Sequence, residues 1–462
     1  SHKLLAGILF NEGDIEGSIK HALRAAPDDY ENNLVLGRAY FANSDFSDAE
    51  EALLNAWGIA SEQELSWGVR DQALLIACMA YKQNFEDHAL ANLSDGLAEG
   101  YLKKETSDSD NFQNIEYVKK YEKYARQLAN DNHHTNKALS ALCFLHLNNI
   151  EASLKLFKDA ELLVSGTLPN INTLKDLKRK EILLTMIKHE YEQITHIDSD
   201  TDGIRNVKIT QKFYDSLKKI YSKSDINFSD DEYELISSLH KIRYNKAPKS
   251  RSNYLNKNHD TNLYEKIYKE SNPQIVVIDD FLDETYLCDL RKFFRCANIF
   301  KYPYPAGYIG AFLGKGMANK SILELSRELK DTFPNIFDMT NLSQAWAYKY
   351  DSQQKGISIH ADDARVNVNF WITDDSANLN KQTGGMIIWG KEPSLDTKFS
   401  EFNSLSSIPR MEEEVKNTDS VKIPYKSNRA VIFNSKLYHA TDDINFKDDY
   451  INRRINVTFL YK

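Results

Sequence analysis

The chain has 462 residues, of which 42% are hydrophobic and 27% charged, and its formal net charge is -9 at pH 7. A chain of this length forms two or three domains rather than one core. The excess of acidic groups disfavours nonspecific binding to nucleic acid or anionic lipid. No apolar window is long enough to span a membrane, and no signal-peptide pattern stands at the start. The four cysteines form no CxxC pair, which indicates reduced thiols and a cytoplasmic protein.

The first part of the chain, residues 1–165, contains a repeated helical pattern. Residues 13–20 (GDIEGSIK) recur as 148–155 (NNIEASLK), and residues 44–49 (SDFSDA) are a looser copy, with a further one around 77–93. The offset between neighbouring copies is close to the ~34-residue period of tetratricopeptide repeats. This part therefore resembles a tetratricopeptide solenoid with degenerate repeats. Such a solenoid would offer a concave surface to a peptide or protein, and a plain helical bundle is the alternative.

Small residues support pairing of these helices. Gly7 and Gly37 each stand three positions before an aromatic residue, where paired antiparallel helices would approach closely. Residues 166–270 keep a helical pattern without the repeat, and we predict helices over 174–194 and 207–221. A basic run from 241 to 257 is more typical of a solvated linker than of a nucleic-acid contact.

The last part of the chain carries a candidate metal site. His360 and Asp362 lie two positions apart in an apolar, β-branched run that we expect to be a strand, so both side chains point to one face. They would supply two ligands of a 2-His-1-carboxylate facial triad, which leaves coordination positions open on iron(II). A third ligand is then required. His439, which follows another strand-like run, is the candidate.

The final strand-like run carries a candidate anion-binding arginine. Arg454 shares one predicted face with Asn456 and Thr458, whereas Arg453 lies on the apolar face. A guanidinium offers a carboxylate two parallel donors, which a lysine cannot. A shift of one residue in register would exchange the two arginines.

The order of these residues resembles the iron(II)- and 2-oxoglutarate-dependent oxygenases. Residues 360–362 (HAD), His439 and Arg454 match the HxD…H…R pattern of that family, and residues 384–386 (GGM) match its Gly-Gly-apolar turn. Residues 274–282 (QIVVIDDFL) resemble the opening of the prolyl-hydroxylase-like branch. The resemblance covers roughly residues 273–462. It implies iron(II), 2-oxoglutarate and dioxygen as cofactor and cosubstrates.

The resemblance also assigns roles. The implied iron ligands are His360, Asp362 and His439, and no catalytic residue beyond them is expected. Arg454 would bind the distal carboxylate of 2-oxoglutarate, with Asn456 and Tyr350 as further contacts.

The implied fold is a double-stranded β-helix, or jelly-roll, over residues 271–462, preceded by a helical linker region over 166–270 and the helical repeats. Outer helices are expected near 283–295 and 320–331. Polar residues 391–427 are expected to interrupt the strands as a lid or substrate-binding element. The core strands are predicted near 344–350, 356–361, 365–373, 384–389, 429–434 and 453–461. One face of 366–373 must line the barrel, but its alternation does not say which.

The sequence therefore predicts a dioxygenase that hydroxylates a C–H bond, in a protein or peptide side chain bound partly by the helical repeats. The alternatives are a hydroxylase of a small metabolite or a sugar or lipid precursor, and a scaffold without activity. The sequence disfavours nucleic acid as a substrate, because the AlkB-type demethylases have a second arginine six positions after the first, where this chain has Leu460.

Overall fold

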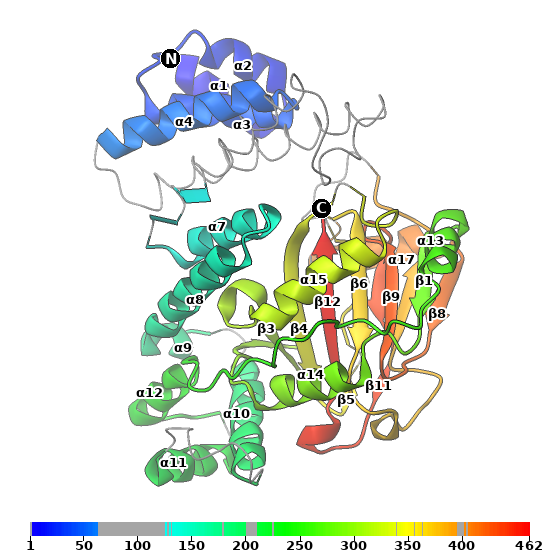
Figure 1. Cartoon of the computed structure of the whole chain (residues 1–462). Helices are drawn as coiled ribbons and strands as arrows, with labels where there is room; N and C mark the ends of the chain where they lie inside the picture. Colours follow the sequence, from blue (N-terminus) through cyan, green and yellow to red (C-terminus); the bar gives the residue numbers. More distant parts are fainter. Residues whose placement is uncertain are drawn as a thin grey trace. The chain divides into compact units, whose positions relative to one another are not determined.

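The computed structural model in Figure 1 divides into two compact units, Ser1–Asn132 and His133–Lys462. The structure describes residues 2–62, 125–126, 129–130, 132–177, 180–199, 210–223, 226–338, 340–354, 356–362, 364–394, 402 and 405–462.

The first unit contains helical hairpins. Its described helices are α1 (His2–Glu12), α2 (Ile15–Ala22), α3 (Tyr30–Ala42) and α4 (Phe46–Glu62). A Cβ atom at Gly37 would overlap the side chain of Leu53, so α3 and α4 approach closely at that glycine, as predicted. The same prediction is wrong for Gly7, because no atom lies within 4 Å of a Cβ built there.

The sequence repeat corresponds to one recurring turn. Gly13, Ser44 and Asn148 all have positive φ, at 85°, 66° and 59°, and the next helix begins two residues later. In each turn this residue and its successor donate backbone N–H groups to carbonyls of the preceding helix. The third copy joins α7 (His134–His146) to α8 (Ile150–Gly166), which belong to the second unit. The copy around 77–93 lies outside the described residues.

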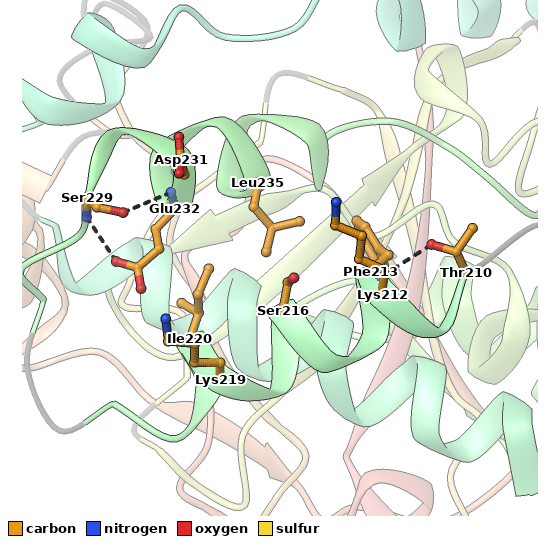
Figure 2. Close-up of a pocket in the computed structure, with 10 residues that line it drawn as sticks. All are labelled: Thr210, Lys212, Phe213, Ser216, Lys219, Ile220, Ser229, Asp231, Glu232 and Leu235. Carbon is orange, nitrogen blue, oxygen red and sulfur yellow. Dashed lines mark hydrogen bonds between the residues drawn. The ribbon is translucent and has the colours of Figure 1, made fainter.

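Further helices lead to the sheets: α9 (Ile171–Lys175), α10 (Glu181–Ser199), α11 (Gln211–Tyr221), α12 (Asp230–Ser238) and α13 (Thr261–Glu270). The predicted helices over 174–194 and 207–221 correspond mainly to α10 and α11. A hollow of about 470 Å³ lies between α11 and α12. Figure 2 shows the residues that line it, none of which is a predicted site residue. Within the described ranges, no helix is both long and apolar enough to cross a membrane.

Two antiparallel sheets form the core of the second unit. The large sheet has the order β1-β9-β6-β12-β4-β3-β2, the small sheet the order β10-β7-β8, and β11 pairs with β5. Their bounds are β1 Ile275–Ile278, β2 Tyr302–Tyr304, β3 Tyr308–Phe312, β4 Leu342–Tyr350, β5 Gln353–Gln354, β6 Val366–Trp371, β7 Met386–Trp389, β8 Ser420–Ile423, β9 Arg429–Asn434, β10 His439–Thr441, β11 Ile444–Asn445 and β12 Ile455–Tyr461. Buried residues of β1, β6 and β9 pack against those of β7 and β8, so the sheets face one another. This agrees with the predicted two-sheet architecture.

Helices cover the outer face of the large sheet. Phe370 and Phe459 pack edge to face there, and the Tyr461 hydroxyl donates to the Ser326 carbonyl of α15 (Lys320–Thr332). Arg291 of α14 (Glu284–Cys296) donates to the Ile372 carbonyl that follows β6. Both helices match their predicted positions.

Charged groups dock α10 onto the same outer face. The fully buried Lys349 amino group of β4, whose pKa burial lowers well below its ordinary value, lies 3.1 Å from His189 Nε2 and donates to the Phe294 carbonyl at 3.0 Å. Lys301 donates to Glu190 at 2.9 Å, and both side chains are buried. Buried charges of this kind are tolerated only when paired. The helices before the sheets are therefore integral to the second unit.

Three predictions about strands are wrong. Residues 356–361 form no strand, because Gly356 has φ 70° and a single bridge joins His360 to His439. The polar stretch 391–427 contains β8 as well as α17 (Ile408–Val415). Of the β8 residues only Ile423 is buried, which explains why no strand pattern was visible. The third error is the omission of the short strands β2, β3, β5, β10 and β11.

Candidate metal and cosubstrate site

The structure brings the three predicted ligands together. His360 and His439 exchange backbone hydrogen bonds, with N···O distances of 3.0 and 2.8 Å. The Asp362 N–H then leaves this pairing and donates to the Ser435 carbonyl at 3.2 Å. Ligand atoms of His360, Asp362 and His439 all lie within 4.8 Å of one another. A single bridge at His360, rather than the predicted strand, precedes Asp362, and the ligand atoms of the HxD motif still converge with that of His439.

Backbone carbonyls fix the tautomers of both imidazoles. His360 Nδ1 lies 2.9 Å from the Ser358 carbonyl oxygen, and His439 Nδ1 lies 2.8 Å from that of Leu437. A carbonyl oxygen only accepts, so each Nδ1 carries the proton and each Nε2 presents a lone pair. His360 Nε2 is 4.0 Å from Asp362 Oδ1, and His439 Nε2 is 3.5 Å from Asp362 Oδ2. Metal-ligating histidines show this arrangement, in which the second nitrogen donates to a backbone or carboxylate oxygen.

The environment keeps His360 neutral. Burial, and then the neighbouring His439, lower the pKa of His360 to about 4, although Asp362 opposes the shift. A metal ligand must be the neutral imidazole. The His360 side chain keeps 19% of its surface exposed, against 7% for His439 and 10% for Asp362. The cluster therefore opens to solvent beside His360.

Arg454 is buried in an aromatic setting. Its guanidinium lies 4.9, 5.7 and 6.0 Å from the ring centres of Tyr350, Trp371 and Tyr425. It donates to the carbonyls of Gly384 and Gly385 and, at 3.1 Å, to Asn456 Oδ1. Among the described residues no carboxylate forms an ion pair with it. A buried cation of this kind matches an anionic ligand.

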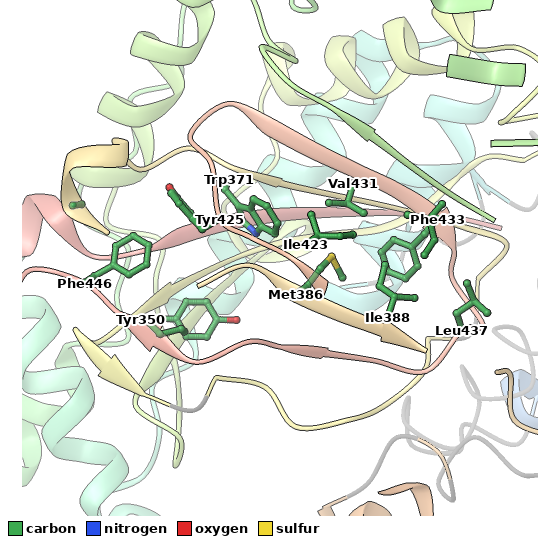
Figure 3. Packing of buried hydrophobic residues seen from close by; sticks show 13 residues of the cluster. Tyr350, Trp371, Met386, Ile388, Ile423, Tyr425, Val431, Phe433, Leu437 and Phe446 are labelled. Carbon is green, nitrogen blue, oxygen red and sulfur yellow. The ribbon is translucent and has the colours of Figure 1, made fainter. Parts of the chain in front are cut away.

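Two further donors near Arg454 have no acceptor. The Tyr350 hydroxyl and Trp371 Nε1 are buried and make no hydrogen bond of ordinary geometry to a described group, although the Thr441 and Arg454 side chains lie close to the Tyr350 hydroxyl. Figure 3 shows these rings with Tyr425 in the buried cluster between the sheets. Burial raises the pKa of Tyr350 although Arg454 lowers it, so the hydroxyl keeps its proton and can donate. Trp371 was not predicted as a site residue, because the alternation of β6 left its inner face undetermined.

Arg453 has a different environment. It forms ion pairs with Glu192 of α10 at 2.5 Å and with Asp351 at 3.0 Å. The structure therefore places Arg453 on the outer side and Arg454 on the inner side, as the preferred register requires.

A polar row on the inner face joins the metal cluster to Arg454. Asn367 Nδ2 donates to Asp362 Oδ2 at 3.2 Å, and Asn369 Nδ2 donates to Thr458 Oγ1 at 3.0 Å. Asn456 Nδ2 donates to the same hydroxyl at 3.3 Å. The inner face of β6 thus carries Asn367, Asn369 and Trp371. The sequence identified these residues as one alternating set but could not choose between the two faces.

Part of the stretch 391–427 packs against the sequence neighbours of the two candidate metal-binding histidines. Met411 and Val415 of α17 belong to a buried cluster with Ile359, Ala361 and Tyr438, which are sequence neighbours of the two histidines. The Tyr438 hydroxyl also donates to Glu414 of α17 at 2.7 Å. The described part of this stretch therefore buttresses the cluster.

The Gly-Gly turn positions Arg454. Gly384 has φ 83°, and a Cβ atom at Gly385 would overlap the carbonyl oxygen of Ile423 at the end of β8. We expect Gly385→Ala to destabilise the protein by about 1–3 kcal/mol, the usual cost of overpacking. If Arg454 binds 2-oxoglutarate, as the resemblance implies, the substitution should also weaken that binding, because both carbonyls that hold Arg454 would move. Denaturant unfolding and ligand titration measure the two effects.

Gly390→Ala is the matched control for this substitution. A Cβ atom there would have its nearest neighbours at 3.7 Å, an ordinary contact. If Gly385→Ala behaves like Gly390→Ala, the close approach does not position Arg454.

The sequence matches no family model and no curated protein. Among solved structures, it is similar to SnoN, a non-heme alpha ketoglutarate dependent epimerase from nogalamycin biosynthesis, at 14% identity and a TM-score of 0.31 over 44% of this chain and 82% of that chain. It is also similar to a Pseudomonas putida prolyl-4-hydroxylase, at 9% identity and a TM-score of 0.29 over 44% and 98%. It is similar as well to HygX from Streptomyces hygroscopicus with nickel and 2-oxoglutarate bound, at 10% identity and a TM-score of 0.29 over 43% of this chain and 85% of that chain. Likenesses this loose assign neither a reaction nor a substrate to this chain.

Proposed function

We propose that this protein is an iron(II)- and 2-oxoglutarate-dependent dioxygenase that hydroxylates a C–H bond. The observation that carries the proposal is the cluster of His360, Asp362 and His439, whose two Nε2 lone pairs and carboxylate suit the facial triad of such enzymes. The buried Arg454 supplies the cation that the second carboxylate of 2-oxoglutarate requires.

The chain's own residues would hold and orient these groups. Ser358 and Leu437 carbonyls orient the imidazoles, and Asn367 orients the Asp362 carboxylate. Arg454 would pair with the distal carboxylate of 2-oxoglutarate. The Tyr350 hydroxyl and Trp371 Nε1 would donate further hydrogen bonds to the cosubstrate. Asn456 orients the guanidinium. Iron(II) with 2-oxoglutarate and dioxygen would supply an oxidant able to hydroxylate an unactivated C–H bond.

Succinate formation tests the enzyme assignment without knowledge of the substrate. Members of the proposed class convert 2-oxoglutarate to succinate slowly when no substrate is present, so we expect iron-dependent succinate release from the full chain. The alternative of an inactive scaffold predicts none.

We infer further that the substrate is a protein or peptide, bound partly by the helical repeats. The recurring helix–turn–helix units support this, since stacked units of that kind commonly present a surface to a polypeptide. A small metabolite is the alternative. Cys143, Cys288 and Cys296 are thiols, which suits a reducing compartment such as the cytoplasm.

Removal of the first unit tests the peptide inference. The chain should be cut before His133, because the helices after that point belong to the unit that contains the sheets. We expect the shortened protein to keep substrate-free succinate formation and to lose most of the hydroxylation of a protein substrate, since remote binding energy is removed. Full hydroxylation of the true substrate by the shortened protein would contradict the inference.

A further inference from the structure

Two amide oxygens between the sheets lack a hydrogen-bond donor. Oδ1 of Asn367 and Oδ1 of Asn369 are buried, and no described group donates to either. The Asn367 amide is fixed, because its Nδ2 donates to the Asp362 carboxylate, which only accepts. A buried acceptor left unpaired costs about 1–3 kcal/mol. The Asn367 oxygen is therefore expected to receive a donor from a bound molecule, and Asn369, whose Thr458 partner can donate or accept, can turn its own oxygen toward the same molecule.

That molecule is not 2-oxoglutarate. The ionised cosubstrate has acceptors only, and the unpaired groups beside Arg454 are the donors Tyr350 Oη and Trp371 Nε1. Of the unpaired acceptors, Asn367 lies at the other end of the polar row, where it touches Asp362, and Asn369 lies between that end and Arg454. Donors at one end and acceptors at the other indicate two ligands of opposite hydrogen-bonding character.

An aromatic surface continues from these amides across the sheet. Thr458 of β12 pairs with Asn369 on one side and with Trp346 of β4 on the other. The residues of β4, β3 and β2 that share this inner face include no charged side chain. They are Gln344, Trp346, Tyr348, Tyr350, Tyr308, Gly310, Phe312, Tyr302 and Tyr304.

The rings on this face pack against one another and form a continuous aromatic surface, called the aromatic floor below, rather than an open ring of aromatic side chains around a pocket. Tyr304 stacks on Tyr308 with centroids 4.6 Å apart, and Tyr348 meets Tyr308 edge to face at 5.0 Å. A Cβ atom at Gly310 would lie 3.0 Å from both Phe312 and Tyr348, so these rings lie over the glycine. No space for a cation or a side chain remains between stacked rings. The surface therefore suits an apolar C–H face laid upon it.

The floor itself carries no charged side chain. Burial raises the pKa of Tyr302 to about 12 and raises that of Tyr348 well above its ordinary value, which reflects a medium of low polarity. At its margin, Lys315 Nζ already lies 4.0 Å from the Tyr302 ring centre. A charged substrate group would have no counterion among the described residues of this face.

The size of the floor points to a polypeptide. It spans three strands, about 10 Å across, and four residue steps along β4, about 13 Å. That area exceeds one amino-acid side chain, so residues flanking the reacting one would cover it.

We propose that Asn367 and Asn369 select a side chain that carries an amide N–H or a hydroxyl, presented on a peptide whose apolar flanks lie on the aromatic floor. The proposal rests on the oxygenase function inferred above. Its substrate class is a peptide with a reacting asparagine, glutamine, serine or threonine.

Isosteric peptides test the selection. The full chain, with iron(II) and 2-oxoglutarate, would be mixed with pools of blocked peptides whose flanking residues are randomised. The pools differ only in one fixed residue, so that an Asn pool is compared with Leu and Asp pools, and a Thr pool with a Val pool. We expect Asn and Thr pools to stimulate succinate formation at least about 10-fold more than Leu, Val and Asp pools, because an unpaired acceptor rejects a ligand without a donor. Equal stimulation by the Leu or Val pools would overturn the proposal.

Variants of Asn369 locate the effect. Asn369→Leu should bring the ratio of Asn-pool to Leu-pool stimulation close to unity, whereas Asn369→Asp keeps an acceptor and should keep a preference. Asn434→Leu is the matched control, since that amide lies on the outer face and contacts Glu392 and Lys436. An unchanged ratio in Asn369→Leu would contradict the assignment.

The remaining outcomes are distinguishable. If the single amino acids asparagine or threonine stimulate succinate formation and no peptide does, the substrate is not a polypeptide. Absence of any iron-dependent succinate formation would instead refute the oxygenase function.

Discussion

Replacement of Asp362 by alanine is expected to abolish iron-dependent succinate formation and to reduce iron binding far below one ion per chain. The carboxylate is the single anionic member of the cluster, with oxygens 4.0 Å from His360 Nε2 and 3.5 Å from His439 Nε2. Loss of groups outside the coordination sphere alone typically costs 10–100-fold in metal affinity or activity. Loss of a ligand should therefore cost more than about 100-fold. Metal analysis and succinate assays measure the two effects.

Asp443→Ala provides the matched control, because its carboxylate is exposed and lies four positions after His439. Thermal unfolding of the metal-free proteins should show that Asp362→Ala remains folded, since its side chain lies at the open end of the sheets rather than in the apolar core. Retention of iron and turnover by a folded Asp362→Ala protein would remove the basis for the proposed function.

The sequence predicted the site better than it predicted the strands around it. The order of His360, Asp362 and His439 sufficed to identify the cluster, because the match to the HxD…H order does not depend on the local backbone conformation. The predicted strand itself is absent. His360 makes one bridge to His439, and the Asp362 N–H turns to Ser435. Local alternation cannot show where pairing stops, because that depends on the partner chain segment.

Other features required the three-dimensional structure. Both faces of β6 are almost entirely buried, one under helices and one between the sheets, so alternation alone could not assign Asn367 or Trp371 to the interior. Strand β8 has three exposed residues and pairs only with β7, which removes the usual apolar signal. Strands β2 and β3 surround the sequence Pro305-Ala306-Gly307, and turn-forming residues so close together obscure short strands.

The second large effect is expected at Arg454. Arg454→Ala should leave the distal carboxylate of 2-oxoglutarate desolvated and unpaired, which typically costs about 2–5 kcal/mol. The half-saturating concentration of 2-oxoglutarate should therefore rise by about 30-fold or more. Arg454→Lys should recover only part of the affinity, because an ammonium lacks the planar pair of donors. Iron binding should change little, since the guanidinium contacts glycine carbonyls and Asn456 rather than the cluster.

Two companion variants separate ligand binding from folding. Tyr350→Phe keeps the ring against Arg454 and deletes a hydroxyl without a described partner, so it should weaken 2-oxoglutarate binding by about 1 kcal/mol without lowering stability. Arg453→Leu should do the opposite. It breaks the ion pairs with Glu192 and Asp351 and should lower the thermal midpoint while leaving 2-oxoglutarate affinity intact. If Arg453→Leu weakens 2-oxoglutarate binding and the Arg454 variants do not, the cosubstrate pairs with the outer arginine, and the proposed direction of the inner face is wrong.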